Sequence, residues 1–127
     1  MVNHWQNEGM QGRITQILGL APDNGDHPFG RSYMTAYQIA IELERSDPAL
    51  LTRVDMELGG DGQPRSLARY VAQNLSRASG ADSNYPIQGA FLWTRSVDQL
   101  RYNTSTGEVV TYTRQGTENL SIFRLRP

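Results

Sequence analysis

The chain contains no cysteine and no lysine. Without cysteine it cannot build a disulfide scaffold, a thiolate zinc site or a thiol nucleophile. Without lysine it cannot form a Schiff base with a carbonyl substrate. It also lacks any apolar run near the roughly 18 residues of a membrane-spanning helix, and its first residues, MVNHWQNEGMQGR, lack the pattern of a secretory signal. We therefore expect a soluble cytoplasmic protein with no membrane contact.

The familiar motifs of catalysis and of metal binding are missing as well. The chain has neither the G-x-S-x-G turn of a serine hydrolase nor the H-E-x-x-H pair of a zinc protease. Carboxylate pairs such as Glu42 with Glu44 are two residues apart, which on a helix directs the two side chains away from each other. The DNGDH segment, Asp23 to His27, has the composition of a turn. We predict no catalytic residues, no metal site and no cofactor.

A length of 127 residues suits one domain with one apolar core. We expect residues 1–127 to form that domain, with residues 1–34 as an N-terminal extension and loop. Within this extension, the apolar residues of GRITQILGLA fit helical spacing slightly better than strand spacing, and the PDNGDHPFG segment that follows is rich in turn formers.

Apolar residues at helical spacing predict three helices, at about 36–45, 48–57 and 67–78. Thr35 and Gln38 match a capping box before the first helix. Asp47 precedes a proline, so we expect it to cap the second helix. Gly80 is expected to end the third helix.

The extended pattern that follows predicts four strands, at about 87–94, 98–103, 108–114 and 120–125. Helices followed by antiparallel strands indicate an α+β fold. We therefore predict three helices packed on one small antiparallel sheet of three to four C-terminal strands.

The GGDGQPRS segment, residues 59–66, joins the second and third predicted helices. Free backbone N–H groups and a helix dipole can bind an anion at such a place, and Arg65 beside Ser66 would help. The segment matches neither the Walker A nor the dinucleotide-binding pattern. The favoured interpretation is structural: Gly59 and Gly60 end one helix and Ser66 caps the next.

Charge is distributed unevenly, although the net charge is −1. Residues 35–62 carry six acids and two arginines, residues 63–80 carry three arginines and no acid, and residues 85–127 carry five arginines and three acids. An acidic helical segment therefore precedes a basic helix and a mildly basic tail, and such an arrangement bears on association.

The order of three helices and then hairpins resembles that of a winged-helix DNA-binding domain. Arg69, Gln73 and Arg77 recur at four-residue steps and would line one face of the third helix. Arg101 and Arg114 would lie on the hairpin. The slightly negative net charge opposes this interpretation, so DNA is an alternative partner and not the favoured one.

Aromatic residues suggest a further alternative, a small-molecule pocket between the helices and the sheet. Its candidate lining is Tyr37, Tyr70, Phe91, Trp93 and Tyr102. Ordinary core packing of these rings is the favoured explanation.

Our leading interpretation is a non-catalytic binding or interaction module that associates with itself. The last predicted strand, LSIFRL at 120–125, has apolar residues on both faces and would be adhesive if it lay unpaired at a sheet edge. We therefore predict a homodimer that covers this edge, with another protein as the alternative partner.

Overall fold

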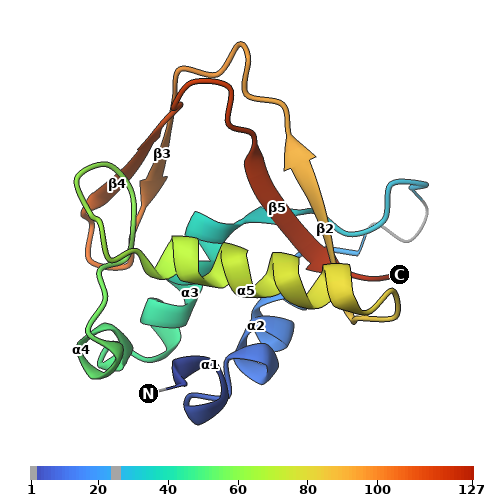
Figure 1. Ribbon diagram of the computed structural model, residues 1–127, viewed down its shortest axis with the longest axis horizontal. Coiled ribbons are helices and arrows are strands. Elements are labelled where there is room, and N and C mark those ends of the chain that lie inside the picture. Colours follow the sequence, from blue (N-terminus) through green and yellow to red (C-terminus); the bar gives the residue numbers. More distant parts are fainter. Residues whose placement is uncertain (1–2, 24–26) are drawn as a thin grey trace.

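The computed structural model describes residues 3–23 and 27–127 and has an α+β fold, which confirms the predicted class (Figure 1). The helices of the described residues are α1 (His4–Asn7), α2 (Met10–Leu18), α3 (Ala36–Ser46), α4 (Leu50–Val54) and α5 (Leu67–Ala81). The strands are β1 (Met34–Thr35), β2 (Ile87–Leu92), β3 (Gln99–Asn103), β4 (Val109–Thr113) and β5 (Leu120–Leu125). None of these helices is long and apolar enough to cross a membrane.

The strands form two antiparallel sheets where one was predicted. One sheet has the order β1-β5-β2, and β3 pairs with β4 in the other. The pairing of β3 with β4 continues the register of the pairing of β2 with β5, because the two residue numbers of each pair have the same sum in both sheets. The segment from 87 to 125 is therefore one long hairpin, here called the ribbon, whose middle part is not paired as a sheet. This middle part, residues 93–98 and 114–119, is called the waist.

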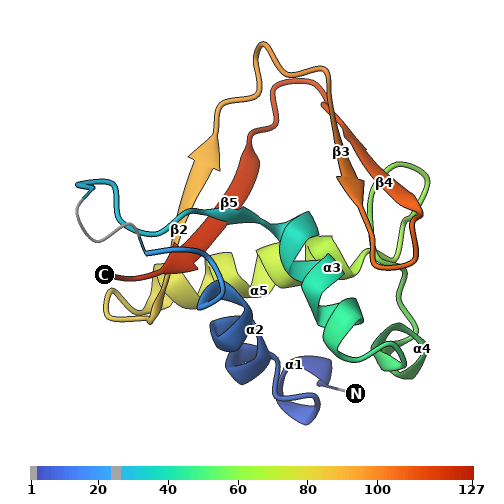
Figure 2. The same cartoon turned by 180° about the vertical axis from the view of Figure 1, so that it is seen from behind.

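The waist keeps the register of the ribbon while its backbone bends. The buried Thr94 donates its hydroxyl to the Glu118 carbonyl at 2.5 Å, and the Arg114 N–H donates to the Asp98 carbonyl at 3.1 Å. Both bonds join residues that oppose each other in that register. Figures 1 and 2 show the consequence: β2 and β5 meet the helices near the end of α5, whereas β3 and β4 lean away and reach the loop before α5.

The main core lies between the helices and the β1-β5-β2 sheet. Its fully buried members include Met10, Ile14, Leu18, Ile39, Leu43, Leu67, Val71, Leu75, Ile87 and Phe123. Helix α2 contributes the first three of these residues, which confirms the helical interpretation of that segment. The N-terminal part therefore supplies a core helix in addition to the predicted loop.

Two predicted helix starts are confirmed. Thr35 accepts the Gln38 N–H at 3.2 Å while the Gln38 side chain accepts the Thr35 N–H at 2.8 Å, which completes the capping box. Ser66 accepts the Arg69 N–H at 3.0 Å at the start of α5. Both signals are local, so they survive in the folded chain.

The second helix is shorter than predicted, and its predicted cap is wrong. Asp47 makes no cap bond to α4, because its carboxylate accepts hydrogen bonds from Arg13 and Arg53. Helix α4 ends at Val54, and the next residue, Asp55, has a φ of 55°. Beyond it, Glu57 forms backbone hydrogen bonds with the segment that leads into α5. These bonds take the place of the hydrogen bonds that a further helical turn would need.

The predicted roles of three glycines also change. Gly59 and Gly60 do not end α4; they lie in the following loop with φ of 129° and 101°. Gly80 lies inside α5, which continues to Ala81. A glycine weakens a helix by about 1 kcal/mol relative to alanine, which is too little to end one supported by core packing.

The prediction that LSIFRL forms a sheet edge is wrong. Strand β5 is central: Phe123 pairs with Met34 of β1 on one side and with Gly89 of β2 on the other. The two residues of β1 carry no strand pattern of their own, so this second partner of β5 could not be predicted from local patterns. The argument that placed a homodimer interface on β5 therefore no longer holds.

Candidate functional site

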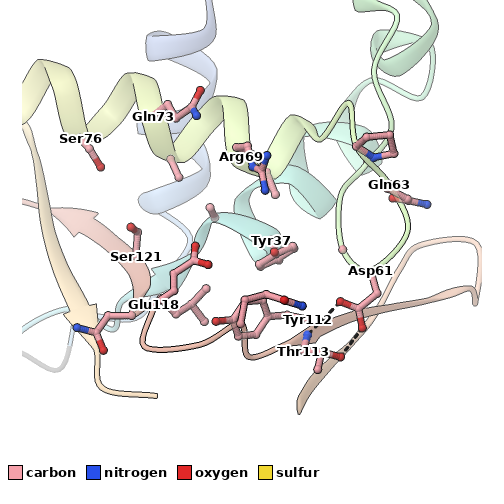
Figure 3. A pocket seen from close by; sticks show the side chains of 18 of the residues that line it. Tyr37, Asp61, Gln63, Arg69, Gln73, Ser76, Tyr112, Thr113, Glu118 and Ser121 are labelled. Atoms are coloured by element: carbon pink, nitrogen blue, oxygen red, sulfur yellow. Dashed lines mark hydrogen bonds between the residues drawn. The ribbon is translucent and has the colours of Figure 1, made fainter. Parts of the chain in front are cut away.

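An open groove of about 1420 Å³ lies between α5 and the ribbon (Figure 3). One face of α5 forms one wall, and β4, the waist and the start of β5 form the opposite wall. Tyr37 of α3 and the loop 60–64 complete the lining. We call this site the α5 groove.

The wall from α5 is basic and polar. Arg69, Gln73, Ser76 and Arg77 lie on successive turns of its exposed face, as the four-residue steps in the sequence imply. Within the described residues, neither arginine has a carboxylate in ion-pair distance. The groove therefore presents two guanidinium groups that form no ion pair with a carboxylate of the described residues.

The opposite wall carries one acid among neutral hydrogen-bonding side chains. Glu118 points from the waist toward α5, and Ser121 lies beside it (Figure 3). Gln115 and Asn119 line the same wall. Donors and acceptors thus face the arginines across the groove, with a carboxylate among them.

Tyr37 and Tyr112 lie in the middle of the groove, between Glu118 and Asp61 (Figure 3). Tyr37 stacks on Tyr102 with 5.4 Å between the ring centroids, and Tyr112 lies 5.7 Å from Tyr37. Burial raises the pKa of Tyr37 to about 12 and also raises the pKa of Tyr112. The phenols are therefore protonated at neutral pH, and they supply apolar faces and hydroxyl groups in place of a base.

The Tyr112 hydroxyl is of particular interest because its side chain lines the groove. The residue is 5 % exposed, and its hydroxyl oxygen is buried with no hydrogen-bond partner among the described residues. A buried hydroxyl without a partner carries an energetic cost, so a bound group that reached it would gain a hydrogen bond.

Asp61 holds the β3–β4 part of the ribbon in place. Its N–H donates to the Thr111 carbonyl at 2.8 Å, and its carboxylate accepts the Thr113 N–H at 3.2 Å and the Thr113 hydroxyl. This carboxylate lines the groove but is already engaged. Its role is to fix the wall formed by β4.

The structure brings together some of the residues predicted for anion or nucleic-acid contact. Arg69, Gln73 and Arg77 share the α5 groove. Arg65 instead pairs with Asp55 at 2.7 Å, and the Ser66 hydroxyl is occupied as the cap of α5. Neither of these two lines the groove.

The structure does not gather the five predicted aromatic residues into one pocket. Tyr37 and Tyr102 stack together. The ring centroid of Tyr70 lies 6.0 Å from that of Trp5, and the Tyr70 hydroxyl accepts the backbone N–H of Trp5. Phe91 and Trp93 are each 70 % exposed on the ribbon.

Several groove residues were not identified from the sequence, among them Asp61, Tyr112, Glu118 and Asn119. No motif marks them. Tyr112, Glu118 and Asn119 approach α5 only when the ribbon bends at the waist, and Asp61 lies in the loop before α5. Neither a protein-family model, nor a curated protein, nor a solved structure matches the chain. Any functional inference must therefore come from the chemistry of the groove.

The two serines of the groove, Ser76 and Ser121, have no hydrogen-bonded histidine or carboxylate in the described structure that could activate them. Both histidines, His4 and His27, lie outside the groove lining. No cluster of three potential metal ligands occurs within 3–23 and 27–127; most of the Asp23–His27 turn, residues 24–26, lies outside these ranges.

Proposed function

We propose that this protein is a non-catalytic binding module and that the α5 groove holds its ligand. The observation that carries the proposal is the pair Arg69 and Arg77, which face the groove without a carboxylate partner in the described part of the chain. A guanidinium group offers five donors in a planar fork that fits carboxylate and phosphate groups. The ligand is therefore a polar molecule with at least one anionic group.

The opposite wall restricts the ligand further. Glu118 would repel a second anionic group placed near the waist and would accept hydrogen bonds from donor groups there. The ring of Tyr37 offers an apolar face between the two walls. The groove thus suits a ligand with an anionic end and a donor-bearing end, and it discriminates against uniform polyanions.

Binding to a panel of inorganic phosphate, a nucleoside monophosphate, a dicarboxylate and a short acidic peptide tests the proposal. A ligand of the groove should raise the melting temperature of the wild-type protein by mass action. Each hydrogen bond to a charged group contributes about 1.5–3 kcal/mol, so the double variant Arg69→Gln, Arg77→Gln should bind at least about tenfold more weakly.

Arg101→Gln is the matched control. Arg101 lies on β3, is exposed and does not line the groove. This variant should bind like the wild type. The proposal fails if no member of the panel stabilises the protein, or if Arg101→Gln weakens binding as much as the double variant does.

DNA binding is the second candidate, and one observation favours it. Arg69, Gln73 and Arg77 share an exposed face of the helix that precedes the ribbon, in keeping with the winged-helix resemblance. Under this alternative, duplex DNA should bind at low salt and lose affinity steeply as salt rises, and Glu118→Gln should strengthen binding. Absence of binding at low salt would remove this candidate.

We also propose that the chain associates with itself, as its sequence suggests. Strand β5 cannot supply the interface, because it is paired on both sides. The two edge strands of that sheet are β1, with two residues, and β2, with six, so β2 offers the longer edge for pairing.

A further inference from the structure

Strand β2 has an open edge. It lies at the end of the β1-β5-β2 sheet, and no other strand of the described chain pairs with its outer side. Figures 1 and 2 both show this side of β2 without a neighbouring strand. The outward N–H and C=O groups of such an edge are a template for another strand.

The edge lacks the features that usually protect exposed strands. Lysine, proline or an inward-pointing charge commonly serves this purpose. The QGAFLW segment, residues 88–93, contains no charged residue and no proline. Phe91 and Trp93 are each 70 % exposed and Leu92 is 37 % exposed. Backbone groups and apolar side chains are thus available along the same segment.

We propose that β2 pairs in antiparallel fashion with β2 of a second copy of the chain, so that the two sheets become one. A two-fold interface brings identical surfaces together, so its surface must be complementary to itself. An uncharged segment meets this requirement, because no like charges oppose each other across the axis. A strand is also the only kind of partner that satisfies a row of strand-edge hydrogen bonds.

Gly89 indicates where the axis passes. Gly89 pairs with Phe123, whose ring lies 3.3 Å from the position that a Cβ atom on Gly89 would take. Phe91, two residues further on, lies on the same face of the sheet. With the axis at Ala90, Phe91 of each copy lies opposite Gly89 of the other. A large ring then covers a position without a side chain, an arrangement known to stabilise glycines at strand edges.

This interface is independent of the α5 groove, since none of the groove-lining residues belongs to β2. The proposal rests on self-association alone and makes no use of a ligand. Loss of ligand binding and loss of dimerisation can therefore be measured separately.

Sedimentation equilibrium from about 1 to about 300 µM tests the proposal, with Phe91→Glu as the decisive variant. A charge at this edge should weaken dimerisation at least about tenfold, because two carboxylates would enter an apolar interface. Phe29→Glu is the matched control: Phe29 is also a phenylalanine, is 77 % exposed and lies outside the ribbon. It should dimerise like the wild type.

Hydrogen exchange supplies a second readout that does not depend on variants. The outward-facing amides of Gly89 and Phe91 should become protected as the protein concentration rises, while amides of β3 should not. A wild-type protein that stays monomeric overturns the proposal. A dimer that forms equally well with Phe91→Glu overturns it as well, because the interface would then lie elsewhere. Equal weakening of dimerisation by Phe91→Glu and Phe29→Glu would also overturn it, because the effect would then not be specific to β2.

Discussion

At the scale of single residues, a cluster of charges away from the groove connects the N-terminal helices to α3 and α4. Asp47 accepts hydrogen bonds from Arg13 at 3.0 Å and from Arg53, and Arg53 also binds Glu8 at 2.8 Å. The bonds from Arg53 and Arg13 lower the pKa of Asp47 from its usual 3.8 to about 2, and Arg53 also lowers the pKa of Glu8.

This cluster predicts a specific pH dependence. Because the pKa of Asp47 is lower in the folded chain, the unfolded chain binds the proton more readily. The stabilisation is therefore complete above about pH 4 and is lost as the pH falls toward about 2. Asp47→Asn should lower the melting temperature at neutral pH and should make it fall less between these two pH values.

Thermal melts across this pH range provide the measurement. Asp98→Asn is the control, because the Asp98 carboxylate makes no ion pair in the described chain. It should keep the wild-type pH dependence. An unchanged acid profile in Asp47→Asn would show that the cluster does not stabilise the fold.

At the scale of elements, the docking of the β3–β4 hairpin defines the groove. Gly60 permits this docking: its φ is 101°, and a Cβ atom there would lie 2.8 Å from the Thr111 carbonyl oxygen and 2.9 Å from a methyl group of Val110. Backbone contact at this distance leaves no room for a side chain. The loop before α5 can therefore hold β4 only because this residue is glycine.

Gly60→Ala should detach the hairpin while leaving the main core folded. Gly62→Ala is the matched control, since Gly62 also has a positive φ, 79°, but has open space around its Cβ position. Both variants should incur the left-handed backbone cost of about 1–2 kcal/mol, and only Gly60→Ala should add the clash. Hydrogen exchange of residues 99–113 should rise in Gly60→Ala far more than in Gly62→Ala. Equal rates would contradict this role of Gly60.

At the scale of the whole molecule, the central strand β5 connects the sheet to the helical core. Phe123 is 2 % exposed and belongs to the main core cluster, whereas Tyr112 lies under the hairpin outside that cluster and connects to it through Tyr37. A change at Phe123 should therefore weaken the entire fold, and a change under the hairpin should act locally.

Phe123→Ala should lower the free energy of unfolding by about 3–5 kcal/mol, the usual cost of removing a buried aromatic ring. Phe29→Ala, at a position that is 77 % exposed, should change it by no more than about 0.5 kcal/mol. Urea unfolding followed by circular dichroism gives both values. Similar losses in the two variants would mean that β5 does not anchor the core.

The sequence by itself determined the features that depend on neighbouring residues. The capping box at Thr35, the cap at Ser66 and the four later strands follow from hydrogen bonds and side-chain patterns within a few residues. The row Arg69, Gln73 and Arg77 could also be predicted, because helical spacing alone puts these residues on one face. The two caps and the helix face need only a few neighbouring residues, and the strand patterns can be recognised before the strands' partners are known.

Only the tertiary structure decided the features that depend on distant contacts. The Asp47 carboxylate accepts hydrogen bonds from Arg13 and Arg53 and does not cap α4, because the two arginines approach it only in the folded chain. β5 became the central strand because two residues near position 34 pair with it, and too short a segment carries no readable strand pattern. The groove itself exists because the ribbon bends at its waist and brings Glu118 to face α5 across it, a geometry that no local pattern encodes.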